Sequence, residues 1–195
     1  MKFLGTKKLE TERLILRKIN QNDYKKAYEN WCNNDNVTKY LLWSTHKNVV
    51  ETKEIYDKAI KEYESDKTFK WIIELKENGE VIGTIDVSKS FLQFGVCEIG
   101  YCIGEKFWNK GYMTEAYQEV IRFLFEECEA KLIVGEYMEG NVASGKVMEK
   151  CGLKYETRLR KRTQDKDGKE NDLIVYSYTI EEYKKDHSNL NEGKK

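Results

Sequence analysis

The sequence has no proline and no net charge. Without proline the chain has no X–Pro bond, so slow cis–trans isomerisation is excluded from its folding. Lysine plus arginine number 34 and aspartate plus glutamate also number 34. A chain without net charge has no general electrostatic attraction for polyanions. We therefore expect no nucleic acid and no membrane among its partners.

Histidine is scarce, and the cysteines are few and widely spaced. The two histidines are His46 and His187, which we expect at the surface. The five cysteines are an odd number and include no CxxC pair. Local spacing therefore assembles no metal site, and none is predicted. Unpaired thiols are typical of a reducing compartment, so we expect a cytoplasmic protein.

Long hydrophobic stretches are also missing. No run approaches the roughly 18 apolar residues of a membrane-spanning helix, and residues 1–8 lack the apolar core of a secretory signal. The 195 residues are 39% hydrophobic and 35% charged, as in a globular protein. We predict one domain over residues 1–195, with a frayed polar tail at 186–195.

The first half of the chain alternates between helical and strand patterns. Leu14 and Leu16 indicate a strand, and helices are expected at about 23–32 and, behind an Asn48 cap, at 49–64. Three strands then follow, at 70–75, 80–88 and 96–103. The first two form a hairpin, because Asn78-Gly79 is a strong turn signal.

The second half returns to helical periodicity at 112–128. A strand at 131–138 and a short helix at 142–150, ended by Gly152, come next. Two last strands, 153–160 and 173–180, are joined by a polar loop at 164–171. The fold class is therefore α/β (α+β): a mixed, mostly antiparallel sheet of about six or seven strands flanked by helices. The strand–helix–strand step at 96–138 can supply one parallel pair.

The segment from Glu98 to Glu115 is the first with a chemical signature. A strand runs through a short loop, in which Asn109 and Gly111 can turn, into the helix expected from residue 112. The first amides of a helix have no intrahelical partner and carry the positive end of its dipole. Such an end binds phosphate through backbone alone. Taken by itself, the segment also fits an ordinary tight turn.

A nucleotide-binding P-loop is the first rival. Residues 140–146 match G-x-x-x-x-G-K after a strand, but Val147 stands where that motif needs serine or threonine for magnesium. The following helix also ends by Gly152, which is short for that fold. Both points argue against this interpretation.

A set of motifs, in order along the chain, resembles the GNAT acetyltransferase superfamily. Within it, the chain is similar to ribosomal-protein N-terminal acetyltransferases, the RimJ/RimL-like group. The matching pieces cover about residues 9–183: Glu12-Arg13-Leu14 with Leu16-Arg17, Ile82-Gly83, Glu98-Ile99-Gly100-Tyr101, Trp108 to Ala116, Asn141 to Ser144, Val147 to Leu153, and Asp172 to Tyr178. The superfamily commonly has glycine where Asn109 stands.

The resemblance implies where acetyl-CoA binds. The sheet would splay between strands 96–103 and 131–138, and the cosubstrate would lie in that V. Its pantetheine would bond the backbone of Tyr101, Cys102 and Ile103. Its pyrophosphate would rest on the amides of the predicted anion-binding loop, Asn109, Lys110, Gly111, Tyr112, Met113 and Thr114.

The resemblance also implies catalytic roles. Glu98 would be the base, directly or through a water, and Ser144 the acid beside the CoA sulfur. Asn141 would bind pantetheine or order a water, and an N–H near Cys102 or Ile103 would polarise the thioester. Each has a plainer alternative: Glu98 a solvated strand residue, Ser144 a helix cap, Asn141 a turn residue. Cys102 lacks a histidine partner, so a nucleophilic role is disfavoured.

The expected function is N-acetyl transfer from acetyl-CoA to a primary amine, by direct attack in a ternary complex. The alternative is a non-catalytic acyl-CoA sensor of the same fold. The sequence does not identify the amine, although family architecture places Tyr40 and Trp43 on the acceptor side. Monomer and homodimer both remain open.

Overall fold

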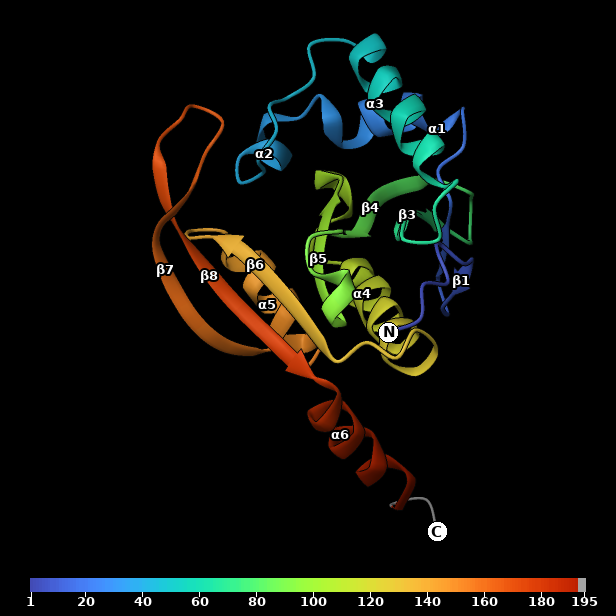
Figure 1. The fold of residues 1–195 in the computed structure, drawn as a ribbon. Coiled ribbons are helices and arrows are strands. Elements are labelled where there is room, and N and C mark those ends of the chain that lie inside the picture. The colour runs from blue at the N-terminus through green and yellow to red at the C-terminus, as the bar shows by residue number, and fades with distance from the viewer. Residues whose placement is uncertain (193–195) are drawn as a thin grey trace.

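Eight strands form one open sheet, in the order β1-β2-β3-β4-β5-β6-β8-β7 (Figure 1). The computed structural model describes residues 1–192, with side chains as far as Ser188. The strands are β1 (Leu9–Glu10), β2 (Leu14–Arg17), β3 (Lys70–Leu75), β4 (Val81–Val87), β5 (Val96–Ile103), β6 (Leu132–Met138), β7 (Lys154–Gln164) and β8 (Glu170–Thr179). The helices are α1 (Asp23–Ala27), α2 (Asp35–Thr38), α3 (Val49–Glu62), α4 (Tyr112–Arg122), α5 (Val142–Lys150) and α6 (Ile180–Glu192).

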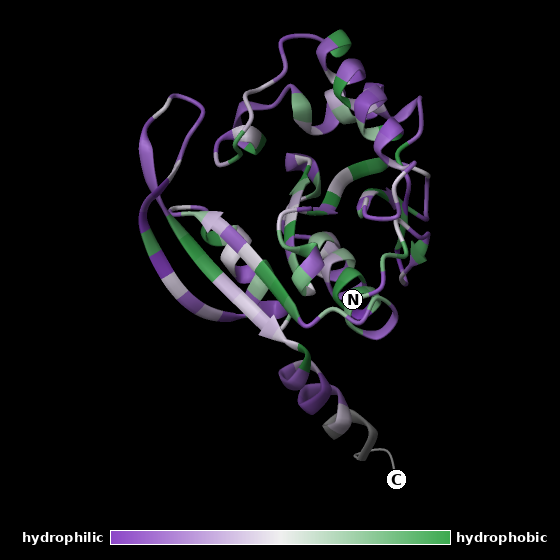
Figure 2. Ribbon diagram, viewed as in Figure 1, coloured by the Kyte–Doolittle hydropathy of each residue, from purple (hydrophilic) through white to green (hydrophobic). Residues whose placement is uncertain are grey.

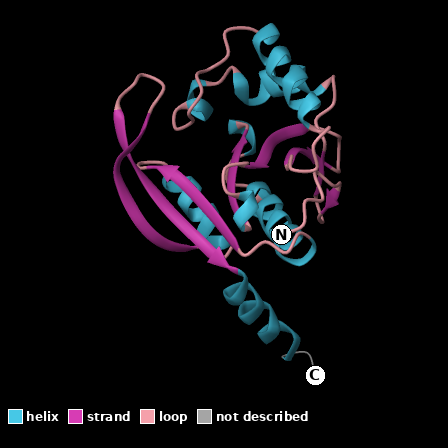
Figure 3. Ribbon diagram, viewed as in Figure 1, coloured by secondary structure: helices cyan, strands magenta, loops and turns pink. Residues whose placement is uncertain are grey.

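One parallel pair joins two antiparallel halves of the sheet. Strands β1 to β5 form an antiparallel ladder, and β6, β8 and β7 form another. Strands β5 and β6 pair in parallel only from Val96–Leu132 to Glu98–Val134. Beyond that point β5 and β6 continue without pairing to each other, so the sheet splays open between them (Figures 1 and 3). The predicted fold class, the parallel pair and the splay are all confirmed.

Helices cover both faces of the sheet. On one face, α4 buries Met113, Ala116, Tyr117, Val120 and Ile121, whose spacing of three and four residues places them on one side of a helix. On the other face, the turn that follows α1, Tyr28–Cys32, and helix α3 pack Trp31 and Tyr56 against the strands. Hydropathy follows this arrangement, with hydrophilic residues along α6 and the tip of the β7–β8 hairpin (Figure 2).

Several element boundaries differ from the sequence-based expectation. Strand β1 and helix α2 were not predicted, because two and four residues are too short to show a period. Strands β7 and β8 extend to Gln164 and back to Glu170, and β7 is exposed along almost its whole length. An exposed strand carries no alternation of apolar and polar residues to mark its end.

The C-terminal segment also departs from the prediction. Residues 186–192, expected as a frayed tail, continue α6, and residues 193–195 of that predicted tail lie outside the described part. Helices α1 and α4 each run on into a π-helical turn, Tyr28–Cys32 and Phe123–Glu127. Within residues 1–192, no helix is long and apolar enough to cross a bilayer.

Candidate active site

The loop before α4 has the backbone geometry of an anion-binding site. Asn109 and Gly111 both lie in the left-handed region, with φ of 60° and 79°. Helix α4 begins directly after Gly111, and its first backbone bond runs from the Glu115 amide to the Gly111 carbonyl at 3.0 Å. The amides of the preceding three residues therefore have no intrahelical partner. Because no side chain in the described part caps this end, it fits a diphosphate group.

Side chains in this loop point away from the open helix end. Met113 is buried in the core, so only its amide is available to a ligand, as the resemblance implies. The indole nitrogen of Trp108 donates to the Ile103 carbonyl at 2.8 Å, which ties the loop back to the end of β5. The conformation of Asn109 explains why glycine is common there in the superfamily, since asparagine is among the few residues that tolerate the left-handed region.

An ion pair that the sequence did not reveal holds this helix end in place. Glu115 accepts hydrogen bonds from the Thr11 hydroxyl at 2.6 Å, the Arg13 amide at 2.9 Å and Arg13 Nε at 2.6 Å. Arg13 Nη1 also donates to the Lys110 carbonyl at 3.1 Å, and the guanidinium lies 4.6 Å from the Tyr112 ring centre. The loop is therefore fixed to the chain segment between β1 and β2.

Two hydroxyl groups meet on the α4–α5 side of the splay. Tyr101 extends from β5 to the first turns of α5, where its hydroxyl lies 2.6 Å from Ser144 Oγ and 3.1 Å from the Ser144 carbonyl. The Asn141 side chain does not cap α5, although it stands at the N-cap position. The Asn141 carbonyl accepts from the Ser144 amide at 3.0 Å, so the two residues belong to one turn.

Carboxylates occupy the opposite side of the splay. Glu98 and Asp86 lie on one face, because Asp86 pairs with Gly100, two residues beyond Glu98. Glu136 lies on the same face, two residues beyond Val134, the partner of Glu98. Within the described residues none of the three carboxylates forms a hydrogen bond or an ion pair within 4.0 Å. Sequence reasoning identified only Glu98.

Burial and mutual repulsion raise the pKa of two carboxyl groups on this face. The pKa of Glu136 is raised by its partial burial and by the charge of Glu98, against a smaller opposing effect of Arg162. The pKa of Asp86 is likewise raised, by burial and by neighbouring carboxylates, and Lys70 opposes the shift. A positively charged group on this face would relieve that repulsion.

Cys102 lies on the carboxylate face and is poorly suited to nucleophilic attack. Its sulfur lies 3.5 Å from the Thr84 hydroxyl on β4. Burial raises the pKa of its thiol to about 11, against a smaller lowering by the bond with Thr84. At neutral pH the group is therefore the unreactive thiol. Its side chain packs against the buried cluster that contains Trp31 and Tyr56.

Tyr40, one of the two residues expected on the acceptor side, lies near the turn that leads into α5. A Cβ atom at Gly140, after β6, would lie 3.5 Å from the Tyr40 ring, so Tyr40 reaches the loop that leads to α5. Lys166, in the β7–β8 hairpin, bonds Asp35 of α2 at 2.9 Å. These contacts join segments that are far apart in sequence, and Figure 1 shows α2 near the β7–β8 hairpin.

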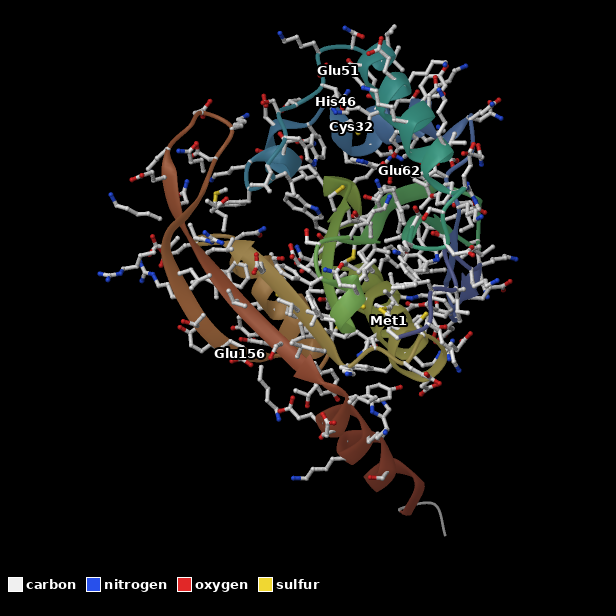
Figure 4. The ribbon with its side chains drawn as sticks, in the orientation of Figure 1. Met1, Cys32, His46, Glu51, Glu62 and Glu156 are labelled. Atoms are coloured by element: carbon white, nitrogen blue, oxygen red, sulfur yellow. The ribbon has the colours of Figure 1, made fainter. Side chains whose placement is uncertain are left out.

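One histidine is not where the sequence analysis placed it. His46, in the loop that connects α2 and α3, is only 6% exposed, whereas a surface position was expected (Figure 4). Its Nδ1 lies 2.7 Å from the Thr52 hydroxyl, and its ring packs 5.1 Å from Trp43. Burial lowers the pKa of His46, so the ring is neutral at pH 7. His187 is exposed, as predicted, and stacks on Tyr183.

Comparisons with known proteins agree with this geometry. Residues 13–154 match the family model described as acetyltransferase (GNAT) domain. The uncharacterized N-acetyltransferase YoaA of Bacillus subtilis is 28% identical over 169 residues, which are 87% of this chain and 94% of that protein. The [ribosomal protein uS5]-alanine N-acetyltransferase of Escherichia coli is 33% identical over 78 residues, 40% of each chain.

A solved structure extends the comparison to a ligand complex. The microcin C7 self-immunity acetyltransferase MccE, in complex with acetyl-CoA and AMP, matches with a TM-score of 0.78. The match covers 87% of this chain and 93% of that one at 20% identity, so it shows the shared fold.

Proposed function

The chain belongs to the GNAT acetyltransferase family, and on that premise we propose that it transfers the acetyl group of acetyl-CoA to a primary amine by direct attack within a ternary complex. The observation that carries this proposal is the uncapped α4 terminus, which faces a sheet split between β5 and β6. The first supplies backbone donors for a diphosphate, and the second exposes unpaired strand edges along which an extended pantetheine can bond.

The cosubstrate contacts follow from these two features. Asn109, Lys110, Gly111, Tyr112, Met113 and Thr114 form the diphosphate loop, and the backbone of Tyr101, Cys102 and Ile103 binds pantetheine. Asn141, in the turn that leads into α5, contributes a further polar contact.

Acetyl transfer requires a neutral amine, a donor for the developing oxyanion and a proton for the departing thiolate. Glu98 takes a proton from the amine, directly or through a water, on the carboxylate face. A backbone N–H at Cys102 or Ile103 donates to the oxyanion. Ser144, on the opposite side, donates to the sulfur as the carbon–sulfur bond breaks. One such acid or base contributes a factor of about 10²–10⁴ to the rate.

The acceptor chemistry follows from the charge of the cleft. An amine arrives largely as its ammonium ion, and the unpaired carboxylates of Asp86, Glu98 and Glu136 attract that cation. A free protein N-terminus and a small-molecule amine both satisfy this requirement. The E. coli relative named above acts on the alanine of a ribosomal protein, so N-terminal peptides belong in the first screen.

The test is release of free CoA from acetyl-CoA in the presence of an amine and peptide panel. We expect turnover with at least one acceptor. Glu98→Gln and Ser144→Ala should each lower kcat while acetyl-CoA affinity stays within about twofold of wild type. Glu136→Gln is the matched control, because it removes a neighbouring carboxylate from the same face. If Glu136→Gln lost turnover and Glu98→Gln did not, the base would be Glu136.

The second candidate is a non-catalytic acyl-CoA sensor, which the same diphosphate loop would support. Acetyl-CoA would then raise the melting temperature, yet no acceptor would release CoA. Full turnover in both Glu98→Gln and Ser144→Ala would contradict the assigned roles but not the transferase function.

A further inference from the structure

Tyr101 makes a side-chain hydrogen bond to a residue of another element, α5. Its side chain leaves β5 on the side of α4 and reaches Ser144 across the splay. The 2.6 Å separation of the two hydroxyl oxygens is that of a strong O–H···O bond. This contact crosses the splay and reaches a residue to which the proposed function gives a chemical role.

Because each hydroxyl has a single hydrogen, the direction of the Tyr101–Ser144 bond determines whether Ser144 can donate to a third group. Each hydroxyl has one hydrogen to donate and two lone pairs to accept with. When Tyr101 donates to Ser144 Oγ, the serine hydrogen is free to point to another acceptor. When Tyr101 instead donates to the Ser144 carbonyl, 3.1 Å away, the Ser144 hydroxyl can donate its hydrogen to the Tyr101 oxygen. The first arrangement leaves a donor for the sulfur.

We propose that Tyr101 is a positioning residue, whose hydroxyl holds the Ser144 hydroxyl with its hydrogen directed at the departing CoA sulfur. This inference rests on the acid role assigned to Ser144 under the proposed function. Tyr101 itself neither gains nor loses a proton in the reaction. The serine hydrogen bonds the thiolate as the carbon–sulfur bond breaks, and the Tyr101 hydrogen supports the partial negative charge that develops on Ser144 Oγ.

The environment of Tyr101 suits a permanent donor. Burial raises the pKa of its phenol well above the ordinary value, and the bond with Ser144 opposes that shift only in part. The phenol therefore stays protonated at neutral pH. Its ring packs against the Tyr117 ring, with centres 5.4 Å apart, and this packing fixes the position of the Tyr101 hydroxyl.

A neighbouring tyrosine provides a matched control. Tyr117 is fully buried beside Tyr101, but its hydroxyl has no hydrogen-bond partner in the described part of the chain. Tyr117→Phe removes the same atom from the same aromatic pair without touching Ser144. Tyr101→Phe and Tyr117→Phe therefore differ only in whether the lost hydroxyl was bonded to Ser144.

The experiment is a double-mutant cycle in steady-state kinetics, with an acceptor from the panel. We expect Tyr101→Phe to lower kcat about tenfold, with the KM for acetyl-CoA within twofold of wild type. Tyr117→Phe should leave kcat unchanged. On a Ser144→Ala background, Tyr101→Phe should have no further effect, because the group through which it acts is gone.

Three results would overturn the inference: wild-type kcat in Tyr101→Phe, an equal loss in Tyr117→Phe, or losses that multiply in the Tyr101→Phe/Ser144→Ala double variant. Full turnover in Ser144→Ala would remove the acid role and the inference with it, while the transferase function would stand. No turnover by wild type on the whole panel would instead overturn the transferase function. The same cycle in unfolding free energy would then still report whether the two hydroxyls are coupled.

Discussion

Replacing Glu115 tests how the diphosphate loop is held. The carboxylate uses one oxygen for Thr11 Oγ1 and the Arg13 amide, and the other for Arg13 Nε. In Glu115→Gln the amide oxygen can keep the first two bonds, but its NH₂ group then faces the guanidinium, donor against donor. Glu115→Ala removes all three bonds. The two variants therefore separate the ion pair from the neutral hydrogen bonds.

The magnitude follows from exposure. The Glu115 side chain is 18% exposed and that of Arg13 is 44% exposed, so solvent screens the pair in part. A hydrogen bond to a charged group contributes about 1.5–3 kcal/mol when protected, and we expect about 1–2 kcal/mol from this one. For a chain of 195 residues that corresponds to a fall in melting temperature of about 2–8 °C. Glu115→Ala should lose more.

The effect has a defined pH dependence. Burial raises the pKa of Glu115, but the bonds from Thr11 and Arg13 outweigh it, so the pKa lies below the ordinary value of 4.5. A carboxylate whose pKa is lowered in the folded state stabilises the fold at pH values above its ordinary pKa. This contribution to the free energy of unfolding is lost as the pH falls through the folded-state pKa. The stability gap between wild type and Glu115→Gln should be constant from neutral pH to about 5 and narrow below 4.5.

Denaturant unfolding and acetyl-CoA titration are the assays. Because Arg13 also holds the Lys110 carbonyl, Glu115→Gln should weaken acetyl-CoA binding about two- to tenfold with little change in kcat. Glu119→Gln is the control on the same helix, since Arg122 keeps Glu126 and Glu127 as partners. We call the contacts of Glu115 with Thr11 and Arg13 the Arg13–Glu115 clamp. If Glu115→Gln lost no more unfolding free energy than Glu119→Gln and kept its acetyl-CoA affinity, the clamp would be refuted.

Further predictions concern the loop, the core and the cleft. Gly111 has a φ of 79°, in the left-handed region that disfavours a side chain, so Gly111→Ala should lower the free energy of unfolding by about 1 kcal/mol and raise the KM for acetyl-CoA. A Gly111→Ala variant as stable as wild type would contradict the need for glycine at this position. Arg17→Met leaves buried Asp23 without its 2.7 Å ion pair and should destabilise the fold by about 3 kcal/mol, whereas a neutral result in urea unfolding would disprove it. Cys102→Ala should keep its turnover, because a thiol of pKa about 11 is protonated at pH 7; an acetyl-enzyme adduct by mass spectrometry would argue otherwise.

The conformation of the proposed diphosphate loop was predictable because its signal is local. A strand, a turn with Asn109 and Gly111, and an amphipathic helix follow one another within residues 96–122, and the proposed anion site uses backbone only. The structure places both turn residues in the left-handed region, as that interpretation requires. The splay was likewise implied by motifs that lie close to its two strands.

The Arg13–Glu115 clamp was not predictable in the same way. Its partners are separated by 102 residues, and a surface arginine and a helix-start glutamate are each ordinary. Arg13 stood within a family motif without any assigned role, which was the only signal available. The Tyr101–Ser144 bond spans 43 residues and has the same character.

The carboxylate face shows the limit most clearly. Asp86, Glu98 and Glu136 come from three strands, and only pairing register places them on one side of the sheet. A shift of one residue in either ladder would move a carboxylate to the other face.

The sequence by itself determined the periodicity of the elements, the mostly antiparallel fold class and the turn before α4 that carries the proposed anion site, because each depends on neighbours along the chain. Only the tertiary structure decided which side chains lie around the splay: a carboxylate face, a hydroxyl pair opposite it, and Tyr40 beside Gly140. Those meetings depend on strand register and helix placement, which result from burying the core as a whole and are not encoded in any one segment.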